Sequence, residues 1–173
     1  MKIEKEVFQI SATRSSIDKI RLNGQTGIYP YVSRSALNNG IERFVAKQTG
    51  YDMDDKNVIT VGLDTQTTFF QPMEFYTGQN IQVFRNSKMQ KYEALMFCVL
   101  LQKQMKNFNW GGNGATLGRL RKKSLMVPVT DHDLIDYEYM ETYISAIQKI
   151  IIADVVRYAD KKIAATKQII QVD

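Results

Sequence analysis

The sequence has 173 residues, of which 44% are hydrophobic, and it carries a formal net charge of +5. A chain of this size can bury a hydrophobic core without disulfides or metals to stabilise it. Its single cysteine, Cys98, excludes a disulfide framework or a cysteine zinc site within this sequence. The first residues lack the apolar core of a signal peptide and no apolar run is long enough to cross a bilayer, so we expect a cytoplasmic protein without a membrane partner.

The positive charge is concentrated in one part of the chain. Residues 1–130 hold 18 Lys and Arg against 10 Asp and Glu, whereas residues 131–173 hold 5 against 8. No acidic residue lies between Glu93 and Asp131, a stretch that contains six cations. A basic segment of this kind favours polyanionic partners, although solvated lysine surfaces are common.

The first 130 residues predict short strands separated by turns. Segments rich in β-branched and aromatic residues are interpreted as strands at 6–10, 29–34, 42–46, 57–62, 66–71, 80–85 and 125–129. The sequences LNNG and YTGQN are strong turn signals between them. One helix is expected from about Ser87 to Lys106, because apolar residues recur there every three or four positions. Asn86 or Ser87 can cap its start, and we expect this helix to pack on a sheet.

The last part of the chain has a different pattern. From Asp136 to about Ile170 there is no glycine or proline, and apolar residues recur at helical spacing. The positions expected on one face of this helix are Met140, Ile144, Ile147, Ile151, Val155, Ala159, Ile163 and Ile170. A helix of about 35 residues spans about 50 Å, more than the diameter of the preceding domain, so we expect this face to need a partner. Asp133 or Asp136 can cap the helix. We therefore divide the chain into a domain of residues 1–133 and a C-terminal dimerisation and spacer helix of residues 134–173.

The sequence offers no positive case for an enzyme. The only histidine, His132, lies between two aspartates in a connecting loop, where we interpret it as solvated and without a partner at metal-ligand spacing. The glycines of residues 111–118 fit neither the phosphate-binding pattern G-x-x-x-x-G-K-[ST] nor G-x-G-x-x-G. Asp52, Asp54 and Asp55 carry oxygens suited to Mg²⁺, but a turn is the preferred interpretation. We expect no catalytic residue, no metal site and no cofactor.

Two stretches combine side chains that can read DNA bases with turn residues. In PYVSRSALNNGIERF (30–44), Arg34 can fork onto guanine and Asn38 and Asn39 can pair with adenine, and an ordinary hairpin turn is an equal alternative. In TFFQPMEFYTGQN (68–80), the candidate polar readers are Gln71, Thr77 and Gln79. The aromatic residues of this second stretch favour the alternative that it belongs to the core of a sheet.

A third stretch, residues 107–124, contains four glycines and four cations in NFNWGGNGATLGRLRKKS. Glycines let a loop lie close to DNA, and cations neutralise phosphates. The candidate contacts, with the cations assigned to phosphate, are Lys106, Asn109, Trp110, Asn113, Arg119, Arg121 and Lys122. The alternative is a glycine-rich turn before a strand, with Trp110 in the core, but the coincidence of glycine, amide and cation favours contact with DNA.

Four segments, in this order, resemble the target recognition domain of DNA specificity (S) subunits from type I restriction-modification systems and their BcgI-like type IIB relatives. They are GIYPYVSRSALNNGI (27–41), FYTGQNIQVFR (75–85), GNGATLGRLRKKSLMVPV (112–129) and DYEYMETYI (136–144). The resemblance implies an α+β fold, with a mixed α/β recognition domain of short strands and one packed helix, followed by a long helix for antiparallel coiled-coil pairing. It also implies that the protein reads one half of a bipartite site in double-stranded DNA, docks methyltransferase subunits, and is not itself catalytic.

S subunits generally carry two recognition domains and two helices, whereas this sequence has one of each. Two copies related by a twofold axis restore the arrangement, so we expect a homodimer through the C-terminal helix that recognises an inverted repeat with a fixed gap. A chain that is a fragment, or that works beside a different half, does not recognise an inverted repeat. Two alternatives stay open. A helix-mediated interaction or decoy protein binds a methyltransferase without reading DNA and has no use for the acid-free basic segment. A small nuclease needs a carboxylate cluster, for which Asp54 and Asp55 are the positions to test.

Overall fold

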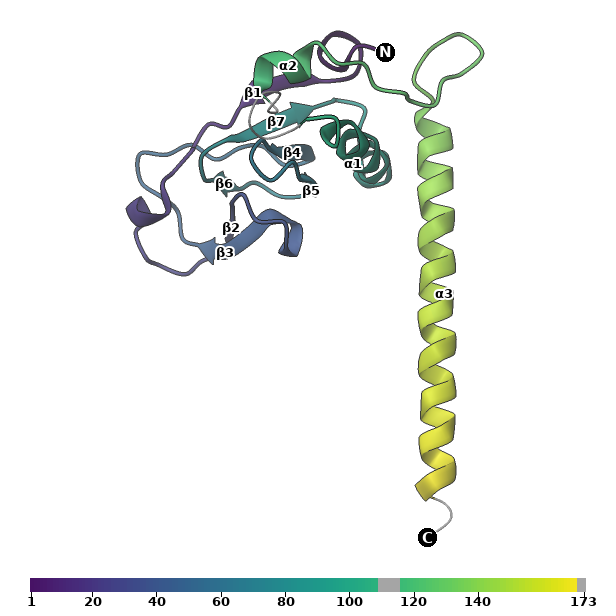
Figure 1. Ribbon diagram of the computed structural model, residues 1–173. Coiled ribbons are helices and arrows are strands. Elements are labelled where there is room, and N and C mark those ends of the chain that lie inside the picture. The colour runs from purple at the N-terminus through teal and green to yellow at the C-terminus, as the bar shows by residue number, and fades with distance from the viewer. Residues whose placement is uncertain (109–115, 171–173) are drawn as a thin grey trace.

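The computed structural model describes residues 1–108 and 116–170, with Ile169 and Ile170 described by their backbone alone. Figure 1 shows short strands and one packed helix, α1, gathered into a domain, and a long helix, α3, that extends away from it. The described elements confirm the expected α+β class, in which a mixed α/β domain of short strands precedes a long helix.

A four-stranded antiparallel sheet forms the centre of the domain. Its strands, in order across the sheet, are β1 (Gln9–Ala12), β7 (Ile81–Arg85), β4 (Val58–Gly62) and β5 (Thr68–Gln71). Alternate residues of a strand point to opposite faces, and both faces of β4 are buried. Ile59 and Val61 join the core beneath α1, whereas Val58 joins a second core on the other face.

A smaller sheet covers that second face. It contains β3 (Ile41–Val45), β2 (Tyr29–Val32) and β6 (Tyr76–Thr77), in that order. β2 is antiparallel to β3 and parallel to β6. Tyr31 and Tyr76 are buried in a third apolar cluster, and the Tyr31 hydroxyl donates to the carbonyl of Ile17 at 2.8 Å. The two sheets together fix the loops that connect their strands.

α1 (Lys91–Met105) packs against the four-stranded sheet, as the sequence predicts. Its buried apolar residues include Phe97, Leu101 and Met105. Phe97 meets Phe8 edge to face, with ring centroids 4.9 Å apart, which is a favourable arrangement of aromatic rings.

The start of α1 differs from the predicted one. The side chains of Gln90 and Glu93 form a capping box, so the helix begins after Gln90. Asn86, one of the two predicted caps, instead donates from its amide to the carbonyl of Val7 at 2.8 Å and to the hydroxyl of Tyr137 at 2.9 Å. Asn86 therefore joins the beginning of the chain to the beginning of α3.

Three further segments differ from the sequence-based expectation. The strand expected at 6–10 begins only at Gln9, because Ile3–Val7 forms a π-helical turn that buries both of its end residues. Residues 125–129 form no strand. The N–H of Leu125 donates to the carbonyl of Met1, and Pro128 has no N–H that could bond to a neighbouring strand. A short helix that was not predicted, α2 (Leu117–Arg121), follows Thr116, whose hydroxyl accepts from the N–H of Arg119.

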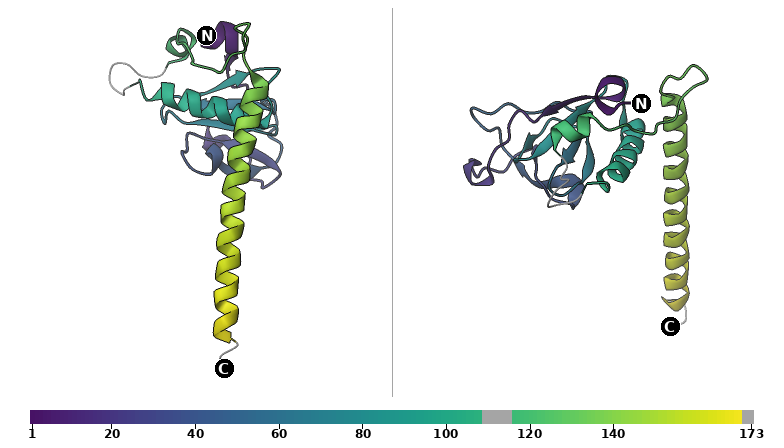
Figure 2. Two further views of the ribbon diagram at one scale, coloured as in Figure 1. Left: turned by 90° about the vertical axis from the view of Figure 1, so that its right-hand side faces the viewer. Right: turned by 45° about the horizontal axis from the view of Figure 1, so that its top comes forward.

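α3 (Tyr137–Ile170) confirms the predicted long helix. Asp136 is its cap, because its carboxylate accepts from the N–H of Tyr139 at 2.9 Å. The first turns pack against α1, and the helix then continues beyond the domain, as Figures 1 and 2 show. Among the described residues, no helix is long and apolar enough to cross a membrane.

Candidate nucleic-acid interface

The loop between β2 and β3 contains a tight turn, Leu37–Gly40, in which two predicted base readers lie. Asn38, Asn39 and Gly40 have φ angles of 51°, 57° and 76°. The N–H of Gly40 closes the turn by donating to the carbonyl of Leu37 at 2.9 Å. Left-handed backbone excludes most side chains, and asparagine and glycine tolerate it best. The turn predicted from LNNG is therefore confirmed.

The two asparagines of this turn have different surroundings. The amide of Asn39 points inward and donates to the carbonyl of Phe70 at 2.8 Å. Asn38 is exposed, and Leu37 beside it is 71% exposed. The amide of Asn39 is engaged by the strand beneath and holds the turn, so Asn38 is the more accessible of the two candidate base readers.

Arg34, in the same loop, exposes half of its side chain and forms an ion pair with Asp64 in the β4–β5 turn. Asn80, in the β6–β7 turn, donates to the same carboxylate at 3.2 Å. The hydrogen bond from Arg34 is the largest cause that holds the pKa of Asp64 below its ordinary value. Gln79 is exposed next to Asn80. Three turns thus meet at one carboxylate and bring together the predicted contact Arg34 and the turn that carries Gln79.

The β4–β5 turn also contacts the C-terminal end of α1. The amide of Gln66 donates to the carbonyl of Phe108 at 2.8 Å, and the amide of Gln102 donates to the carbonyl of Gln66 at 2.8 Å. Lys106, a predicted phosphate contact, is exposed at this end of the helix. The predicted contacts Asn109, Trp110 and Asn113 lie outside the described residues.

Two predicted polar readers are buried. Gln71 is 1% exposed, and its amide donates to the carbonyl of Asn39 at 3.1 Å and to the hydroxyl of Thr60 at 3.0 Å. Thr77 is 0% exposed and bonds to the side chain of Ser15. Neither side chain can reach DNA, so these two assignments are wrong. The alternative that this stretch belongs to the sheet core is correct, because both residues lie on buried strands.

The cations of α2 lie in a different region. Arg119 and Lys122 are exposed. Arg121 is held by Glu4, with Nε and Oε1 2.7 Å apart, and it donates to the carbonyl of Ile10 at 3.1 Å. Figures 1 and 2 place α2 beside β1 and the N-terminus, at the opposite end of the domain from β2 and β3. The predicted phosphate contacts on α2 and at Lys122, the residue that follows it, are therefore separate from the β2–β3 loop.

α3 exposes most of the face that was predicted to meet a partner. The exposed members are Ile147, Ile151, Val155, Ala159 and Ile163. The exposed fractions of the isoleucines and valine among them range from 36% to 61%. Ile144 is half-buried, and the side chain of Ile170 lies outside the described part of the chain. Met140 is 0% exposed and belongs to the core of its own domain, so its assignment to the partner face is wrong.

Three residues of these turns were not identified from the sequence: Asp64, Asn80 and Leu37. Asp64 and Asn80 occur in segments that indicate turns, but no local pattern indicates that the two turns converge on Arg34. Leu37 carries no polar signal, and only its exposure at the tip of a turn draws attention to it. These contacts join residues far apart in the chain, which sequence periodicity does not report.

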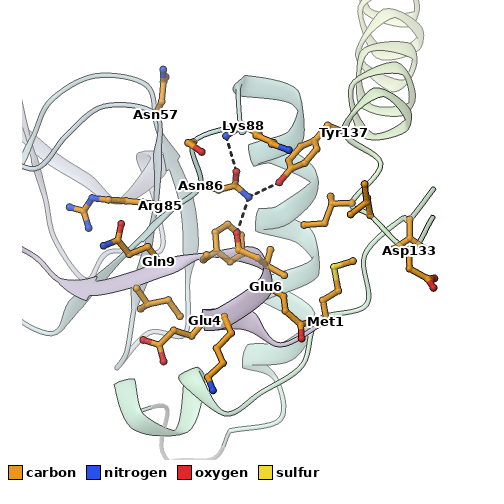
Figure 3. A pocket seen from close by; sticks show the side chains of 18 residues that line it. Met1, Glu4, Glu6, Gln9, Asn57, Arg85, Asn86, Lys88, Asp133 and Tyr137 are labelled. Atoms are coloured by element: carbon orange, nitrogen blue, oxygen red, sulfur yellow. Dashed lines mark hydrogen bonds between the residues drawn. The ribbon is translucent and has the colours of Figure 1, made fainter. Parts of the chain in front are cut away.

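An open pocket of about 1180 Å³ lies where α3 joins the domain (Figure 3). Figure 3 shows Asn86 between the N-terminal segment and Tyr137, with its bonds to Val7 and Tyr137 drawn beside the one that it accepts from the N–H of Lys88. The ammonium group of Lys88 lies 5.9 Å from the centre of the Tyr137 ring. No group of three metal-ligating side chains occurs among the described residues. The contacts in this pocket fix the start of α3 on the domain.

The described residues form an α/β domain of two small sheets with polar and basic loops, joined to a long helix whose apolar face is exposed. Residues 2–171 match the family described as the type I restriction modification DNA specificity domain. The chain belongs to this family.

Two solved structures share the fold. The HsdS subunit from Thermoanaerobacter tengcongensis aligns with a TM-score of 0.60 and 11% identity, over 88% of this chain and 38% of that subunit. The S subunit of a type I restriction-modification system from M. genitalium aligns with a TM-score of 0.52 and 13% identity, over 89% of this chain and 39% of that subunit. The chain thus spans about two fifths of either subunit's length, 38% and 39%. Among curated protein sequences, none matches it.

Proposed function

We propose that this chain is a non-catalytic specificity subunit that reads one half of a bipartite site in double-stranded DNA and docks methyltransferase subunits. Two copies pair through α3 and together recognise an inverted repeat. The observation that carries this proposal is the match of residues 2–171 to the type I restriction modification DNA specificity domain family. The described contacts support a division of labour among the loops and the helix.

Base reading is assigned to the loops around Asp64. Arg34, Asn38 and Gln79 are exposed there. Arginine forks onto guanine, and asparagine and glutamine pair with adenine in the major groove. Leu37, exposed beside Asn38, adds an apolar group suited to the methyl group of thymine.

Phosphate contact is assigned to Lys106, Arg119 and Lys122, which are exposed cations. Such contacts set the position of a protein on DNA and its salt dependence, without reading sequence. Arg121 supports them indirectly, because its bonds to Glu4 and Ile10 fix α2 on the domain.

The homodimer is supported by the apolar face and by the charges of α3. The face continues past the domain, so the described part of the chain does not cover it. The acidic residues Glu138 and Glu141 lie near the start of the helix, and Lys161, Lys162 and Lys167 lie near its end. Antiparallel pairing places these opposite charges side by side, whereas parallel pairing places like charges together.

Methyltransferase docking is assigned to another face of α3. The rings of Tyr139 and Tyr143 stack with centroids 5.8 Å apart, and about half of each residue is exposed. At 3.6 residues per turn, these tyrosines lie about 100° around the helix from Ile151. Helix pairing through Ile151 therefore leaves an aromatic surface uncovered, and aromatic residues are enriched in protein interfaces.

The test is selection of bound duplexes from a random-sequence pool by the purified protein at moderate salt. We expect an inverted repeat with a constant gap, because a symmetric dimer presents two identical domains at a fixed distance. Recovery of a single half-site keeps DNA recognition and overturns the symmetric dimer. Recovery of no motif, together with binding to a methyltransferase, overturns DNA reading and favours the interaction or decoy protein.

A further inference from the structure

We propose that Gln71 and Asn39 are positioning residues for base recognition. They hold the Leu37–Gly40 turn in one conformation and thereby set the direction in which Arg34 and Asn38 face DNA. The inference rests on the proposed function for what the loop reads, and it identifies which residues fix the loop.

The turn needs to be held because its backbone is locally unfavourable. Asn38 and Asn39 have left-handed φ angles, a conformation that persists where surrounding structure enforces it. Asparagine lowers the penalty but does not remove it. An isolated loop with this sequence populates several conformations, so the single observed one depends on contacts with the rest of the domain.

Two hydrogen bonds from opposite directions supply those contacts. The amide of Gln71, on β5, donates to the backbone carbonyl of Asn39 at 3.1 Å. In return, the amide of Asn39 donates to the backbone carbonyl of Phe70, also on β5, at 2.8 Å. A reciprocal pair of this kind fixes both the position and the rotation of the Asn39 peptide, because each bond is directional.

Gln71 is itself fixed by the interior of the sheet. Its amide also donates to the hydroxyl of Thr60 on β4 at 3.0 Å, and Thr60 donates to the carbonyl of Phe69 at 3.2 Å. Gln71 and Thr60 are 1% and 2% exposed. A chain of buried polar groups therefore runs from an interior strand to the exposed turn, and such satisfied networks specify one conformation.

The other side of the turn is packed closely. A Cβ atom added to Gly40 lies 3.2 Å from the Phe69 ring and 3.3 Å from Val32. The carbonyl of Gly40 accepts from the N–H of Ser33 at 2.8 Å. The turn is thus held against the sheet on one side while Leu37 and Asn38 face solvent on the other.

This arrangement has a functional consequence that stability alone does not require. An apolar side chain of similar volume in place of Gln71 fills the same space, but it leaves the carbonyl of Asn39 without this donor, so the turn loses a contact that packing alone does not replace. The amide adds a bond to an exposed turn. A turn fixed in advance loses less conformational entropy on binding, and a displaced base-reading side chain misses its geometry.

The experiment compares Gln71→Met and Asn39→Asp with the unchanged protein. Methionine keeps the length of the side chain and removes both donors, whereas aspartate keeps the tolerance for left-handed backbone and removes the donor to Phe70. The matched control is Gln48→Met. Gln48 is 3% exposed, and its amide donates to the carbonyl of Ala46 at 2.7 Å, at the end of the β2–β3 hairpin away from the turn.

Each variant is measured in three ways: affinity for the selected duplex relative to a scrambled one, salt dependence on the scrambled duplex, and amide exchange of residues 33–41. We expect Gln71→Met and Asn39→Asp to lower the affinity ratio about tenfold or more. We expect exchange of residues 33–41 to become faster, with the salt dependence unchanged, because phosphate contacts remain. We expect Gln48→Met to keep the affinity ratio of the unchanged protein, even if it lowers the melting temperature.

Three outcomes overturn the positioning role. In the first, Gln71→Met and Asn39→Asp keep the affinity ratio of the unchanged protein, which overturns the positioning role alone. In the second, Gln48→Met lowers the ratio equally, which assigns the effect to general destabilisation. In the third, the unchanged protein shows no sequence preference, which overturns the proposed function together with the positioning role.

Discussion

Arg34 and Asp64 form an ion pair between two loops that lie 30 residues apart in the sequence. Asn80 donates to the same carboxylate from a third loop. The guanidinium group that we assign to guanine is therefore restrained before DNA arrives. Its restraint lowers the entropy lost on binding, and the nearby negative charge of Asp64 disfavours phosphate as its partner.

Substitutions of Arg34 and Lys122 are expected to have different effects on DNA binding. Arg34→Ala lowers affinity for the selected site by about 1–3 kcal/mol and relaxes the preference at one base pair, because a bidentate contact is lost. Lys122→Ala weakens binding to all sequences alike and lowers the slope of log affinity against log salt by about one. Titrations over single-base variants of the site, at several salt concentrations, separate the two. Identical profiles would show that the assigned roles are wrong.

Acid is expected to remove the stabilisation from the Arg34–Asp64 pair. Because Arg34 lowers the pKa of Asp64, the native state binds fewer protons than the unfolded state between the lowered and the ordinary pKa. The contribution of this ion pair to the free energy of unfolding is complete above the ordinary pKa of an aspartate. It is lost as the pH falls through the lowered pKa of Asp64 in the native state. Asp64→Asn therefore lowers the free energy of unfolding by up to about 1 kcal/mol near neutral pH, as for a partly exposed pair. Urea unfolding should show the two proteins converging in acid, and a difference that persists there contradicts this account.

Removing the partner of a buried carboxylate is expected to destabilise the domain strongly. Asp54 is 0% exposed and accepts from Arg85 at 3.0 Å and from the backbone N–H of Arg14 at 3.0 Å. Arg85→Met leaves this charge without its ion pair and lowers the free energy of unfolding by about 3–5 kcal/mol. Asp55→Asn is the control, because Asp55 is about half exposed. Its pairs with Arg14 and with Arg85, whose Nε lies 3.5 Å from its carboxylate, are each worth about 1 kcal/mol at most.

The same variant has a pH dependence with a defined sign. Burial is the largest cause that raises the pKa of Asp54 above its ordinary value. The native state therefore binds more protons than the unfolded state between the two values, so this group's contribution falls as pH rises through that window. Arg85→Met raises the pKa of Asp54 in the native state further, because a positive charge that favours the ionised carboxylate is lost. The pH range between the native and unfolded pKa values therefore becomes wider. Unfolding measured from acid to neutral pH should show a smaller penalty in acid, and a constant penalty counts against this explanation.

The apolar face of α3 is expected to carry dimerisation. Ile151→Glu or Val155→Glu places a charge in the helix pair, so the protein becomes monomeric in sedimentation equilibrium. Both positions are exposed in the single chain, so the domain should keep its melting temperature after correction for dimer dissociation. Ala153→Glu is the control, because Ala153 is exposed about 200° around the helix from Ile151. An unchanged protein that is monomeric at every concentration, or equal loss with the control, refutes pairing through this face.

The sequence by itself determined the elements that depend on neighbouring residues. The long helix followed from 3.6-residue periodicity without glycine or proline, and Asp136 caps it as one of two predicted residues. The LNNG turn followed from the tolerance of asparagine and glycine for left-handed backbone. Most central strands followed from β-branched and aromatic composition. The family resemblance came from the order of motifs along the chain, which is also a property of sequence alone.

The tertiary structure decided which of the polar and apolar candidates are accessible. Gln71, Thr77 and Met140 have the side chains that the assigned roles need, yet all three are buried. It also separated α2 from the β2–β3 loop and placed Asp64 beside Arg34. Burial and pairing depend on which distant segments pack together. The type of a residue determines which hydrogen bonds its side chain can form, but it does not determine whether other segments cover that side chain. For that reason the same amide chemistry gives a solvent-facing candidate at Asn38 and a buried support at Gln71.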